Sequence, residues 1–285
     1  MSIIIGTLKS DFLLGTDGND QIFGLIGNDN ISAGLGNDLI YGGLGNDKLA
    51  GDGGNDTFKG SRGNDSIDGG DGLDTADYSD LDKTITLSGV GTVEKAGGFG
   101  KDQLLKVETV IADASVANNT IDASQSVAGV SITADLQAES ISANNVPNLG
   151  TLTFKVVNFD NLTGTNESDS IAGDSQKNQL FGNDSNDSID GRGGNDLITG
   201  GLGNDILRGG LGADKFIFNS LKDGLDTIKD YNFGQTDIIE VSKVGFGTNN
   251  INDFSYNAGS GSLSFLGQQF AFLDNLSSNV SIKLV

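Results

Sequence analysis

Apolar residues recur at every ninth position over two stretches of this 285-residue chain. Seven nonapeptides occupy residues 15–77 without a break, and six more occupy residues 164–217. In each unit, six residues rich in Gly and Asn precede a triplet whose middle residue, at position 8, is apolar. In the first array these residues are Ile22, Ile31, Ile40, Leu49, Phe58, Ile67 and Ala76. Since Gly and Asn favour turns and the triplet alternates in polarity, each unit predicts a turn followed by a very short β-strand.

One apolar residue per unit buries a core only if successive strands stack in register. Two nonapeptides therefore make one coil of about 18 residues, and the coils stack at the sheet spacing of about 4.8 Å. The pattern predicts an all-β fold, a parallel β-roll or β-helix solenoid with two nonapeptide arrays and a C-terminal β cap. Residues 18 apart lie above one another, so the Asp at position 6 of each unit forms columns. One column of the first array holds Asp20, Asp38, Asp56 and Asp74, and the other holds Asp29, Asp47 and Asp65.

The charge of the chain indicates what these columns bind. Asp and Glu number 39 against 17 Lys and Arg, so the net charge is −22, and only five of the acids are Glu. Stacked carboxylates repel one another unless a cation lies between them. Asp carboxylates and backbone carbonyls form an all-oxygen cage that suits Ca²⁺, whereas zinc prefers the His and Cys ligands that this chain lacks. The gaps between stacked turns predict about seven to nine Ca²⁺ ions.

Two missing residue types exclude whole classes of function. The chain has no Cys and no His, which excludes disulfides, thiol nucleophiles, Fe–S clusters, Ser-His-Asp hydrolases and HExxH zinc proteases. The negative charge disfavours nucleic acid as a partner, because phosphate contacts need a basic surface. We expect no membrane-spanning helix, since no run approaches 18 apolar residues, and residues 1–6 do not resemble a Sec signal peptide.

The unit GGLGNDKLA at residues 42–50 resembles the nonapeptide of the RTX (repeat-in-toxin) calcium-binding β-roll family, and the resemblance extends over both arrays. It implies that positions 1, 2 and 4 give carbonyl ligands and that position 6 gives the carboxylate. Residues 214–231, followed by residues 237–240, resemble the segment that closes the roll in serralysin-type proteins, which implies that Asp223 and Asp226 serve the last site. The carboxylate candidates are Asp20, Asp29, Asp38, Asp47, Asp56, Asp65, Asp74, Asp169, Asp187, Asp196, Asp205, Asp214, Asp223 and Asp226. The carbonyl candidates are Gly18, Gly27, Gly36, Gly43, Gly45, Gly54, Gly63, Gly72, Gly194, Gly201, Gly203, Gly210 and Gly212.

Several units depart from the family pattern. In unit 173–181, Gln176 replaces Gly and Asn178 replaces Asp, which puts the metal site between this unit and unit 191–199 in doubt. Glu167 stands at position 4 of unit 164–172. Leu73 and Ala213 replace Asn at position 5, which we expect the fold to tolerate because position 5 gives no carboxylate ligand.

Residues 78–163 lose the nonapeptide but keep alternating apolar and polar positions, at 84–90, 104–111, 129–136 and 152–159. We expect two diverged units of about 50 residues there, stacked as wider rungs without metal. The chain is thus divided into an N-terminal roll (1–77), metal-free rungs (78–163), a second roll (164–217) and a cap (218–285). One continuous solenoid from residue 6 to 217 is favoured over two domains, because no linker rich in Pro and Ser intervenes.

The C-terminal residues 218–285 lead to two predictions. Phe254, Phe265, Phe270 and Phe272 alternate with polar residues, which predicts a compact β cap of the kind that solenoids need at their ends. Proteins that this chain resembles are exported by type I secretion machinery with an uncleaved C-terminal signal. The resemblance therefore implies that residues from about 230 onward serve as an export signal and that the protein is extracellular, secreted or at the cell surface.

These observations favour a secreted calcium-binding protein that folds on binding Ca²⁺ outside the cell, with a structural or cell-surface role and no catalysis. A cell-surface polysaccharide or another surface protein is the candidate partner. One alternative is a β-solenoid enzyme or module that acts on extracellular polysaccharide, although Arg62, Arg192 and Arg208 all lie inside the arrays. The other alternative is an ice-binding solenoid, although position 3 shows no row of Thr and only position 5 repeats Asn.

Overall fold

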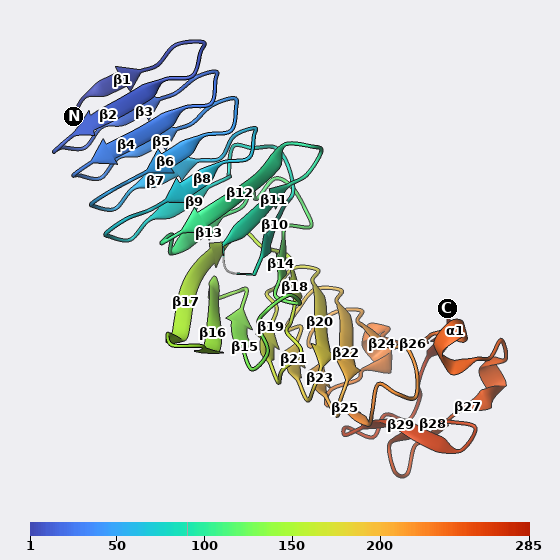
Figure 1. Ribbon diagram of the computed structural model, residues 1–285. Helices are drawn as coiled ribbons and strands as arrows, with labels where there is room; N and C mark the ends of the chain where they lie inside the picture. The colour runs from blue at the N-terminus through green and yellow to red at the C-terminus, as the bar shows by residue number, and fades with distance from the viewer. Residues whose placement is uncertain (90) are drawn as a thin grey trace. The chain divides into compact units, whose positions relative to one another are not determined.

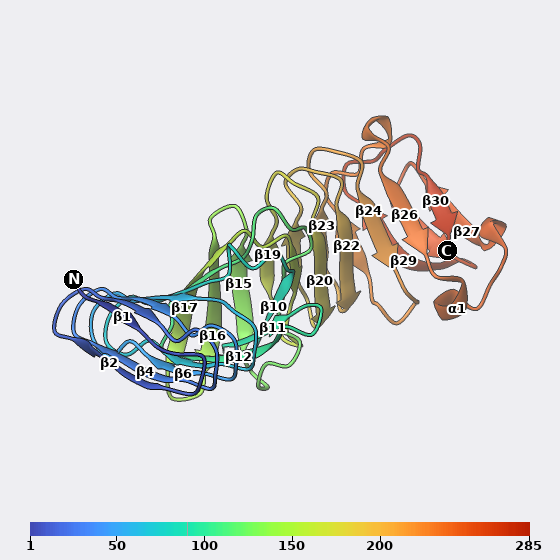
Figure 2. The same ribbon diagram turned by 90° about the horizontal axis from the view of Figure 1, so that it is seen from above.

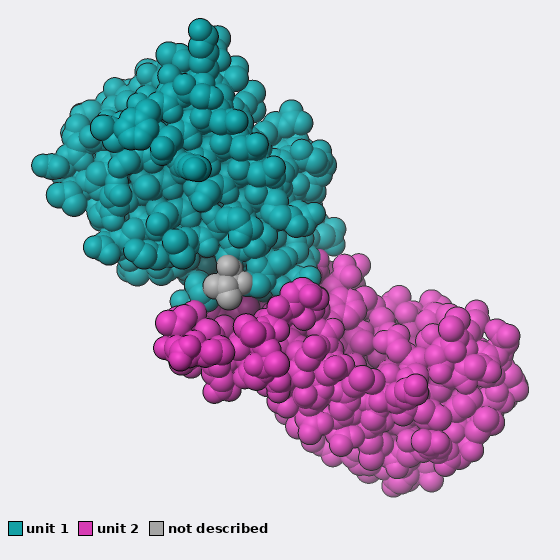
Figure 3. Space-filling model, viewed as in Figure 1, with its two compact units in different colours: residues 1–122, 153–159 teal, residues 123–152, 160–285 magenta. Residues whose placement is uncertain are grey.

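The computed structural model describes residues 1–89 and 91–285. Val90, at the end of the strand expected over 84–90, lies outside the described residues. The chain forms two compact units (Figure 3). Unit 1 comprises Met1–Asp122 and Thr153–Phe159, and unit 2 comprises Ala123–Leu152 and Asp160–Val285. The four-part division drawn from the sequence stays a prediction.

Unit 1 is built from two sheets, to which the strands from β1 to β9 contribute in alternation (Figure 1). The first sheet contains, in order, β1 (Ile3–Ile5), β3 (Gln21–Phe23), β5 (Leu39–Tyr41), β7 (Thr57–Lys59), β9 (Thr75–Asp77), β13 (Thr109–Ile111) and residues 153–157 of β17 (Gly150–Val157). The second contains β2 (Phe12–Thr16), β4 (Asn30–Gly34), β6 (Lys48–Ala50), β8 (Ser66–Asp68), β12 (Gly100–Leu105), β11 (Thr92–Lys95), β10 (Ile85–Ser88) and β14 (Thr120–Asp122). Within the array the strands pair in parallel with a shift of 18 residues, as in Gln21 with Leu39 and Leu39 with Thr57. The predicted coil of two nonapeptides is confirmed.

The narrow interior of the roll is filled by the side chains at position 8. Ile22, Ile40 and Phe58 are fully buried under one sheet, and Ile31, Leu49 and Ile67 are at most 3% exposed under the other. Strands of three residues, such as β3 and β5, bury only their middle side chain. Each rung therefore contributes little apolar surface, and the core is built by stacking.

Residues 78–122 depart from the expected wider rungs. Strands β10, β11 and β12 pair antiparallel, so this segment folds out of the parallel coil and returns to it. The strand expected over 104–111 is two strands, β12 and β13, separated at Lys106, which has a positive φ of 50°. Strand β12 then pairs in parallel with β8 of the array. The segment therefore combines rungs that stack in parallel, β12 on β8 and β10 on β14, with an antiparallel meander that was not predicted from the sequence.

Unit 2 repeats the two-sheet arrangement (Figure 2). One sheet contains β16 (Ser140–Val146), β15 (Ser131–Asp135), β19 (Ser170–Ala172), β21 (Ser188–Asp190), β23 (Ile206–Arg208), β25 (Asp226–Ile228), β29 (Gln268–Leu273), β28 (Ser262–Phe265) and β27 (Phe254–Asn257). The other contains β18 (Asn161–Thr163), β20 (Gln179–Asp184), β22 (Leu197–Leu202), β24 (Lys215–Phe218), β26 (Ile238–Val241) and β30 (Ile282–Leu284). Strands of the array are parallel, whereas β15–β16 and β27–β28–β29 are antiparallel. The all-β solenoid with two parallel arrays is confirmed.

The C-terminal part of unit 2 closes over an aromatic cluster. The ring of Phe246, in the one-turn helix α1 (Lys243–Phe246), lies 5.1–5.5 Å from the rings of Phe254, Phe265 and Phe270. Two 3₁₀ helices, η1 (Phe233–Gln235) and η2 (Ile251–Asp253), complete the helical content of the described chain. No helix in residues 1–89 and 91–285 is long and apolar enough to cross a membrane.

Candidate metal sites

The Asp at position 6 joins consecutive coils through its side chain. Its Oδ1 accepts a hydrogen bond from the backbone N–H of the Asp one coil earlier, from Asp20 to Asp38 (2.7 Å) and from Asp38 to Asp56 (2.8 Å). The second column repeats this contact from Asp29 to Asp47 (2.8 Å). These Asp residues are at most 3% exposed. The stacking of the carboxylates into columns is confirmed, and each one is buried by the coil that it joins.

The second array carries two columns of the same kind. One runs from Asp169 through Asp187 and Asp205 to Asp226, with N–H to Oδ1 distances of 2.8–2.9 Å. The other runs from Asn178 through Asp196 and Asp214 to Asp237, at distances of 2.8–3.0 Å. Asp237 was not among the carboxylate candidates, because it lies beyond the last unit that is in phase.

The second oxygen of most column carboxylates has no protein partner. Among the residues that the structure describes, these buried atoms are the Oδ2 atoms of Asp29, Asp38, Asp47, Asp56, Asp74, Asp187, Asp196, Asp205 and Asp214. A buried anionic oxygen without a donor is costly, and native structures satisfy such groups with donors or cations. The repeated orphan oxygen is the feature that a hard cation would complete.

Glycine at position 1 makes room beside this oxygen. A methyl group on Gly51 would overlap both Asp56 Oδ2 and the carbonyl oxygen of Gly69, one coil away. A methyl group on Gly182 would likewise overlap Asp187 Oδ2 and the carbonyl oxygen of Gly200. A carboxylate oxygen and a carbonyl oxygen thus share one small cradle, which fits the oxygen ligands of Ca²⁺. The family resemblance implied carbonyl ligands from position 1, which is Gly in twelve of the thirteen units, but no position-1 residue was among the candidates named individually.

The candidate glycines at positions 2 and 4 bring the coils close together. Gly45 has a φ of 138°, and a methyl group there would overlap the carbonyl oxygen of Gly27. The other position-4 candidates with φ between 122° and 145° are Gly27, Gly36, Gly54, Gly63, Gly72, Gly194, Gly203 and Gly212. The position-2 candidates Gly43, Gly201 and Gly210 have φ between 89° and 109°. Gly18 differs from all of these, because no other atom lies near the place of its missing side chain.

Burial raises the pKa of several carboxylates in these columns. Desolvation raises the pKa of Asp56 and of Asp196 to about 7, and that of Asp187 to about 8. The carboxylates one coil away add to the rise in the pKa, as Asp38 and Asp74 do for Asp56. No three acidic side chains converge on one point within the described part of the chain. Backbone carbonyls must therefore supply most of the ligands of any bound ion.

Several candidate carboxylates already have protein donors. Oδ2 of Asp20 accepts from the N–H (2.8 Å) and the hydroxyl (2.7 Å) of Thr16, and Thr165 donates to Asp169 in the same way. Oδ2 of Asp65 lies 3.3 Å from the ammonium group of Lys95. Threonine at position 2 therefore satisfies Oδ2 of the first Asp in each of these two columns, while Oδ1 accepts from the preceding rung, from the N–H of Ser2 (2.7 Å) and of Ile132 (2.6 Å).

The two acids assigned to the last site differ in their surroundings. Asp226 lies in the column, with its Oδ1 2.9 Å from the N–H of Asp205. Asp223 instead accepts at Oδ2 from the N–H of Asn219 (2.6 Å) and at Oδ1 from the hydroxyl of Ser220 (2.9 Å). The carboxylate of Asp223 thus caps the turn before β25.

The doubtful unit 173–181 keeps its place in the column. The amide nitrogen of Asn178 donates to the carbonyl of Asp160 (2.7 Å), and its Oδ1 accepts from the N–H of Asp174 (2.9 Å). The guanidinium of Arg192 donates to the carbonyl of Gly173 (2.9 Å) and forms a two-pronged ion pair with Asp135 (2.6 Å). Nitrogen donors of Asn178 and Arg192 therefore bind carbonyl oxygens at this unit, whereas Asp196 and Asp214 of the same column each keep an Oδ2 without a donor.

Two nonapeptides were missed in the sequence. In unit 6–14, the N–H of Asp11 donates to Asp29 Oδ1 (2.8 Å). In unit 97–105, with the sequence GGFGKDQLL, Asp102 Oδ1 accepts from the N–H of Asp65 (3.0 Å). The first unit has Lys9 where Gly is expected. The second starts 28 residues after the start of unit 69–77, which is not a multiple of nine, and so falls out of phase. A search for single units regardless of phase finds the second one.

The Asn residues at position 5 form a ladder that runs in the opposite direction. The Oδ1 of Asn19 accepts from the N–H of Asn37 (3.0 Å), and that of Asn37 from Asn55 (2.9 Å). Leu73 joins this ladder by donating its backbone N–H to Asn55, and Ala213 makes the same contact with Asn195 in the second array. The row of Asn is therefore used within the fold, which weakens the ice-binding alternative that rested on it.

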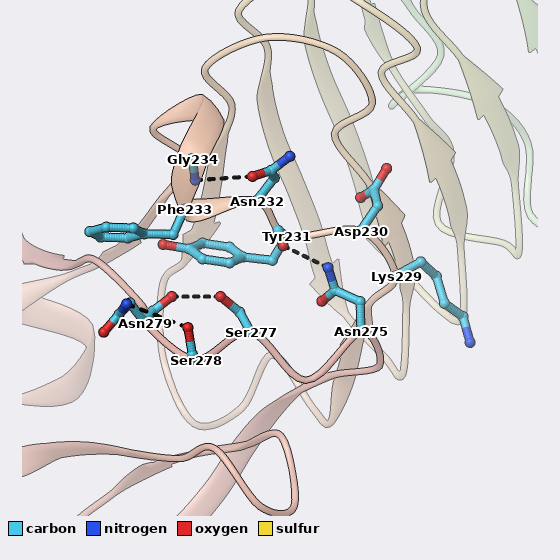
Figure 4. A pocket seen from close by; sticks show the side chains of 10 residues that line it. All are labelled: Lys229, Asp230, Tyr231, Asn232, Phe233, Gly234, Asn275, Ser277, Ser278 and Asn279. Atoms are coloured by element: carbon cyan, nitrogen blue, oxygen red, sulfur yellow. Dashed lines mark hydrogen bonds between the residues drawn. The ribbon is translucent and has the colours of Figure 1, made fainter.

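A separate cavity of about 470 Å³ lies in the C-terminal part of unit 2 (Figure 4). It is lined by residues 229–234, Asn275 and residues 277–279. The hydroxyl of Tyr231 donates to the carbonyl of Asp237 (2.8 Å), and the amide of Asn275 donates to the carbonyl of Tyr231 (2.6 Å). These polar groups hold the segments of the cap together.

Comparison with known proteins agrees with the geometry of the turns. The family of the RTX calcium-binding nonapeptide repeat (4 copies) matches residues 5–40, 25–58, 41–76, 159–189 and 181–216. No curated protein gives a significant match. Among solved structures, the extracellular lipase LipA from Serratia marcescens is similar over 99% of this chain and 40% of its own, with 20% identity and a TM-score of 0.34. That likeness is too low to bear on activity. The two arrays, residues 5–76 and 159–216, belong to the family of RTX calcium-binding nonapeptide repeats.

Proposed function

We propose that this protein is a secreted calcium-binding β-roll protein that folds when Ca²⁺ binds outside the cell and then serves a structural or cell-surface role. The observation that carries the proposal is the repeated Oδ2 atom of the column Asp residues, which is buried and without a protein partner along both arrays. Calcium is the cation whose ligand preference matches a carboxylate oxygen and stacked carbonyl oxygens.

The energetics favour folding that depends on calcium. Extracellular sites bind Ca²⁺ with Kd of about 10⁻⁴–10⁻³ M. At ten times Kd each site contributes roughly 1.4 kcal/mol, and nine sites contribute about 13 kcal/mol. This sum is comparable to the whole stability of an ordinary domain. Without the ion, the net charge of −22 and the thin core oppose folding.

The proposal also states that the protein is secreted and that it catalyses no reaction. RTX proteins are generally exported by type I systems, and residues from about 230 onward are the segment proposed to carry the signal. A chain that stays unfolded in the calcium-poor cytosol suits export. A cell-surface polysaccharide or surface protein is the proposed partner, and about seven to nine Ca²⁺ ions are the proposed load.

A calcium titration of the metal-free full-length chain tests the proposal. Far-UV circular dichroism is expected to change cooperatively from coil to β-structure near millimolar Ca²⁺, and Mg²⁺ at the same concentration is the control. Mg²⁺ demands near-ideal octahedral geometry and dehydrates reluctantly, so it should not induce the change. A chain already folded without Ca²⁺, or one that folds equally well in Mg²⁺, would reject the proposal.

A further inference from the structure

One gap of the first array is built differently from the others. The missed unit 97–105 adds one more coil above unit 60–68. Its Asp102 stacks on Asp65 (3.0 Å), and the N–H of Lys101 donates to Asn64 Oδ1 (2.8 Å), so both ladders continue into it. Gly100, at position 4, has the positive φ of 106° that this position shares elsewhere. The sequence and the backbone conformation of this unit therefore predict that the gap between Asp65 and Asp102 binds a metal ion as the other gaps are proposed to do.

A lysine side chain lies in that gap. The antiparallel pairing of β11 with β12 places Lys95 opposite Gly100. The ammonium nitrogen is 2.5 Å from Asp102 Oδ1 and 3.3 Å from Asp65 Oδ2. The side chains of Lys95 and Asp102 are 0% exposed and that of Asp65 is 2% exposed. The oxygen that lacks a partner in most other column carboxylates here faces a positive charge.

A tyrosine fills the neighbouring space. Tyr78 follows unit 69–77 and stacks above Gly60, at the position where most other coils have Gly. A methyl group on Gly60 would meet the ring of Tyr78, whereas on Gly42 it would meet the free carboxylate oxygen of Asp47. The hydroxyl of Tyr78 donates to Asp102 Oδ2 (2.8 Å). Both oxygens of Asp102 therefore have donors, and an aromatic ring takes up the room beside Gly60.

We propose that the gap between Asp65 and Asp102 takes no Ca²⁺, because Lys95 supplies its cation and Tyr78 fills its space. A divalent ion placed there would stand beside a fully buried ammonium group, and expelling that group would leave it without its two carboxylate partners. Asp65 remains a candidate ligand in the preceding gap, which lies between Asp47 and Asp65. The last gap of this column in the first array is thus occupied by the ammonium group of Lys95 rather than by a metal ion. This inference rests on the proposed function and deepens it by naming a gap that is closed to metal.

Counting bound ions in two matched variants tests the inference. Asp56→Asn and Asp102→Asn make the same chemical change at position 6 of a unit, the first at an orphan carboxylate of one column and the second at the closed gap of the other. Each variant is dialysed to equilibrium against the same millimolar Ca²⁺ concentration, and bound calcium is taken as the excess inside over outside, measured by elemental mass spectrometry on samples whose circular dichroism matches the parent. The expected result is the loss of at least one ion from Asp56→Asn and no loss from Asp102→Asn. A folded Asp102→Asn protein that loses one ion would overturn the inference.

A second measurement on the parent chain decides the matter if Asp102→Asn fails to fold. Calcium-saturated protein is treated with an amine-acylating reagent, and modified lysines are located by peptide mass spectrometry. Lys101, on the same hairpin, has a side chain that is 53% exposed and serves as the internal control. Lys95 is expected to stay unmodified while Lys101 reacts. Reaction of Lys95 at the rate of Lys101 would show that calcium has displaced it. A parent chain that binds no calcium would reject the proposed function itself, which is a distinct result.

Discussion

The backbone N–H of Asp38 donates to Oδ1 of Asp56 at 2.8 Å, while Oδ2 of Asp56 is buried and meets no protein donor within the described chain. One carboxylate therefore has two separate tasks. One oxygen fixes the stacking of two coils, and the other is left for a ligand that the chain does not supply. The same division recurs at nine Oδ2 atoms of the two arrays. The proposed binding of Ca²⁺ would couple folding to cation binding at these coils.

Replacing Asp56 by Asn tests this division of tasks. The amide oxygen can still accept from Asp38, but the variant loses the charge of Oδ2. We expect the calcium midpoint to rise and the calcium-loaded protein to lose about 1–3 kcal/mol of unfolding free energy, the contribution of one or two sites. Denaturant unfolding at fixed Ca²⁺ measures the loss. Asp17→Asn, an exposed change of the same kind, is the control, and equal effects of the two changes would contradict the assignment.

Gly51→Ala tests the cradle at position 1. The added methyl group would overlap Asp56 Oδ2 and the carbonyl oxygen of Gly69, so we expect the loss of at least one ion and about 1–3 kcal/mol of stability. Gly18→Ala adds the same methyl group where no atom lies nearby and should leave both quantities unchanged. Calorimetric titration with Ca²⁺ gives the number of ions. Normal calcium binding by a folded Gly51→Ala protein would show that the cradle is not the site.

Lys95→Met tests whether the ammonium group of Lys95 is the cation that occupies the gap between Asp65 and Asp102. The variant keeps an apolar stem but leaves Asp65 and Asp102 facing each other without compensation, and breaking a buried ion pair in this way costs about 3–5 kcal/mol. Lys101→Met removes an exposed pair with Glu94 and should cost about 0–1 kcal/mol. Unfolding in saturating Ca²⁺ compares the two variants. A similar small loss in both would mean that Lys95 is not held in the gap.

Calcium affinity should depend on pH in a defined direction. In the folded metal-free chain the pKa of Asp56 is raised to about 7 and that of Asp187 to about 8, above the ordinary Asp value of about 4. The folded state therefore binds more protons than the unfolded state between about pH 4 and pH 8, so metal-free stability is greatest at the acidic end of this window and falls as the pH rises.

Calcium has to displace these protons. Affinity should thus weaken as the pH is lowered from about 8 to about 6. Titrations monitored by circular dichroism at several pH values measure the change. An affinity that stays constant, or that rises toward acidic pH, would show that the column carboxylates are not the ligands.

The columns could be predicted from the sequence because their cause is a strict period. Asp at every ninth position, with two units per coil, places Asp38 above Asp20 whatever the details of the side chains. The unit at 97–105 escaped this reasoning because the meander of β10 and β11 shifts it out of phase. The place of Lys95 depends on how that meander folds back, which no local period encodes. Asp237 was missed for a related reason, since a longer connection separates it from Asp214.

Hydrogen exchange at the N–H of Asp38 tests the central claim most directly. This N–H donates to Asp56 Oδ1 and exists as a bonded, buried group only when two coils are stacked. The account predicts strong protection of this amide in millimolar Ca²⁺ and exchange at the rate of an unfolded chain after chelation, with protection restored when Ca²⁺ is returned. Equal protection with and without Ca²⁺ would contradict it, because the columns would then be stable without the cation that their free oxygens are proposed to bind.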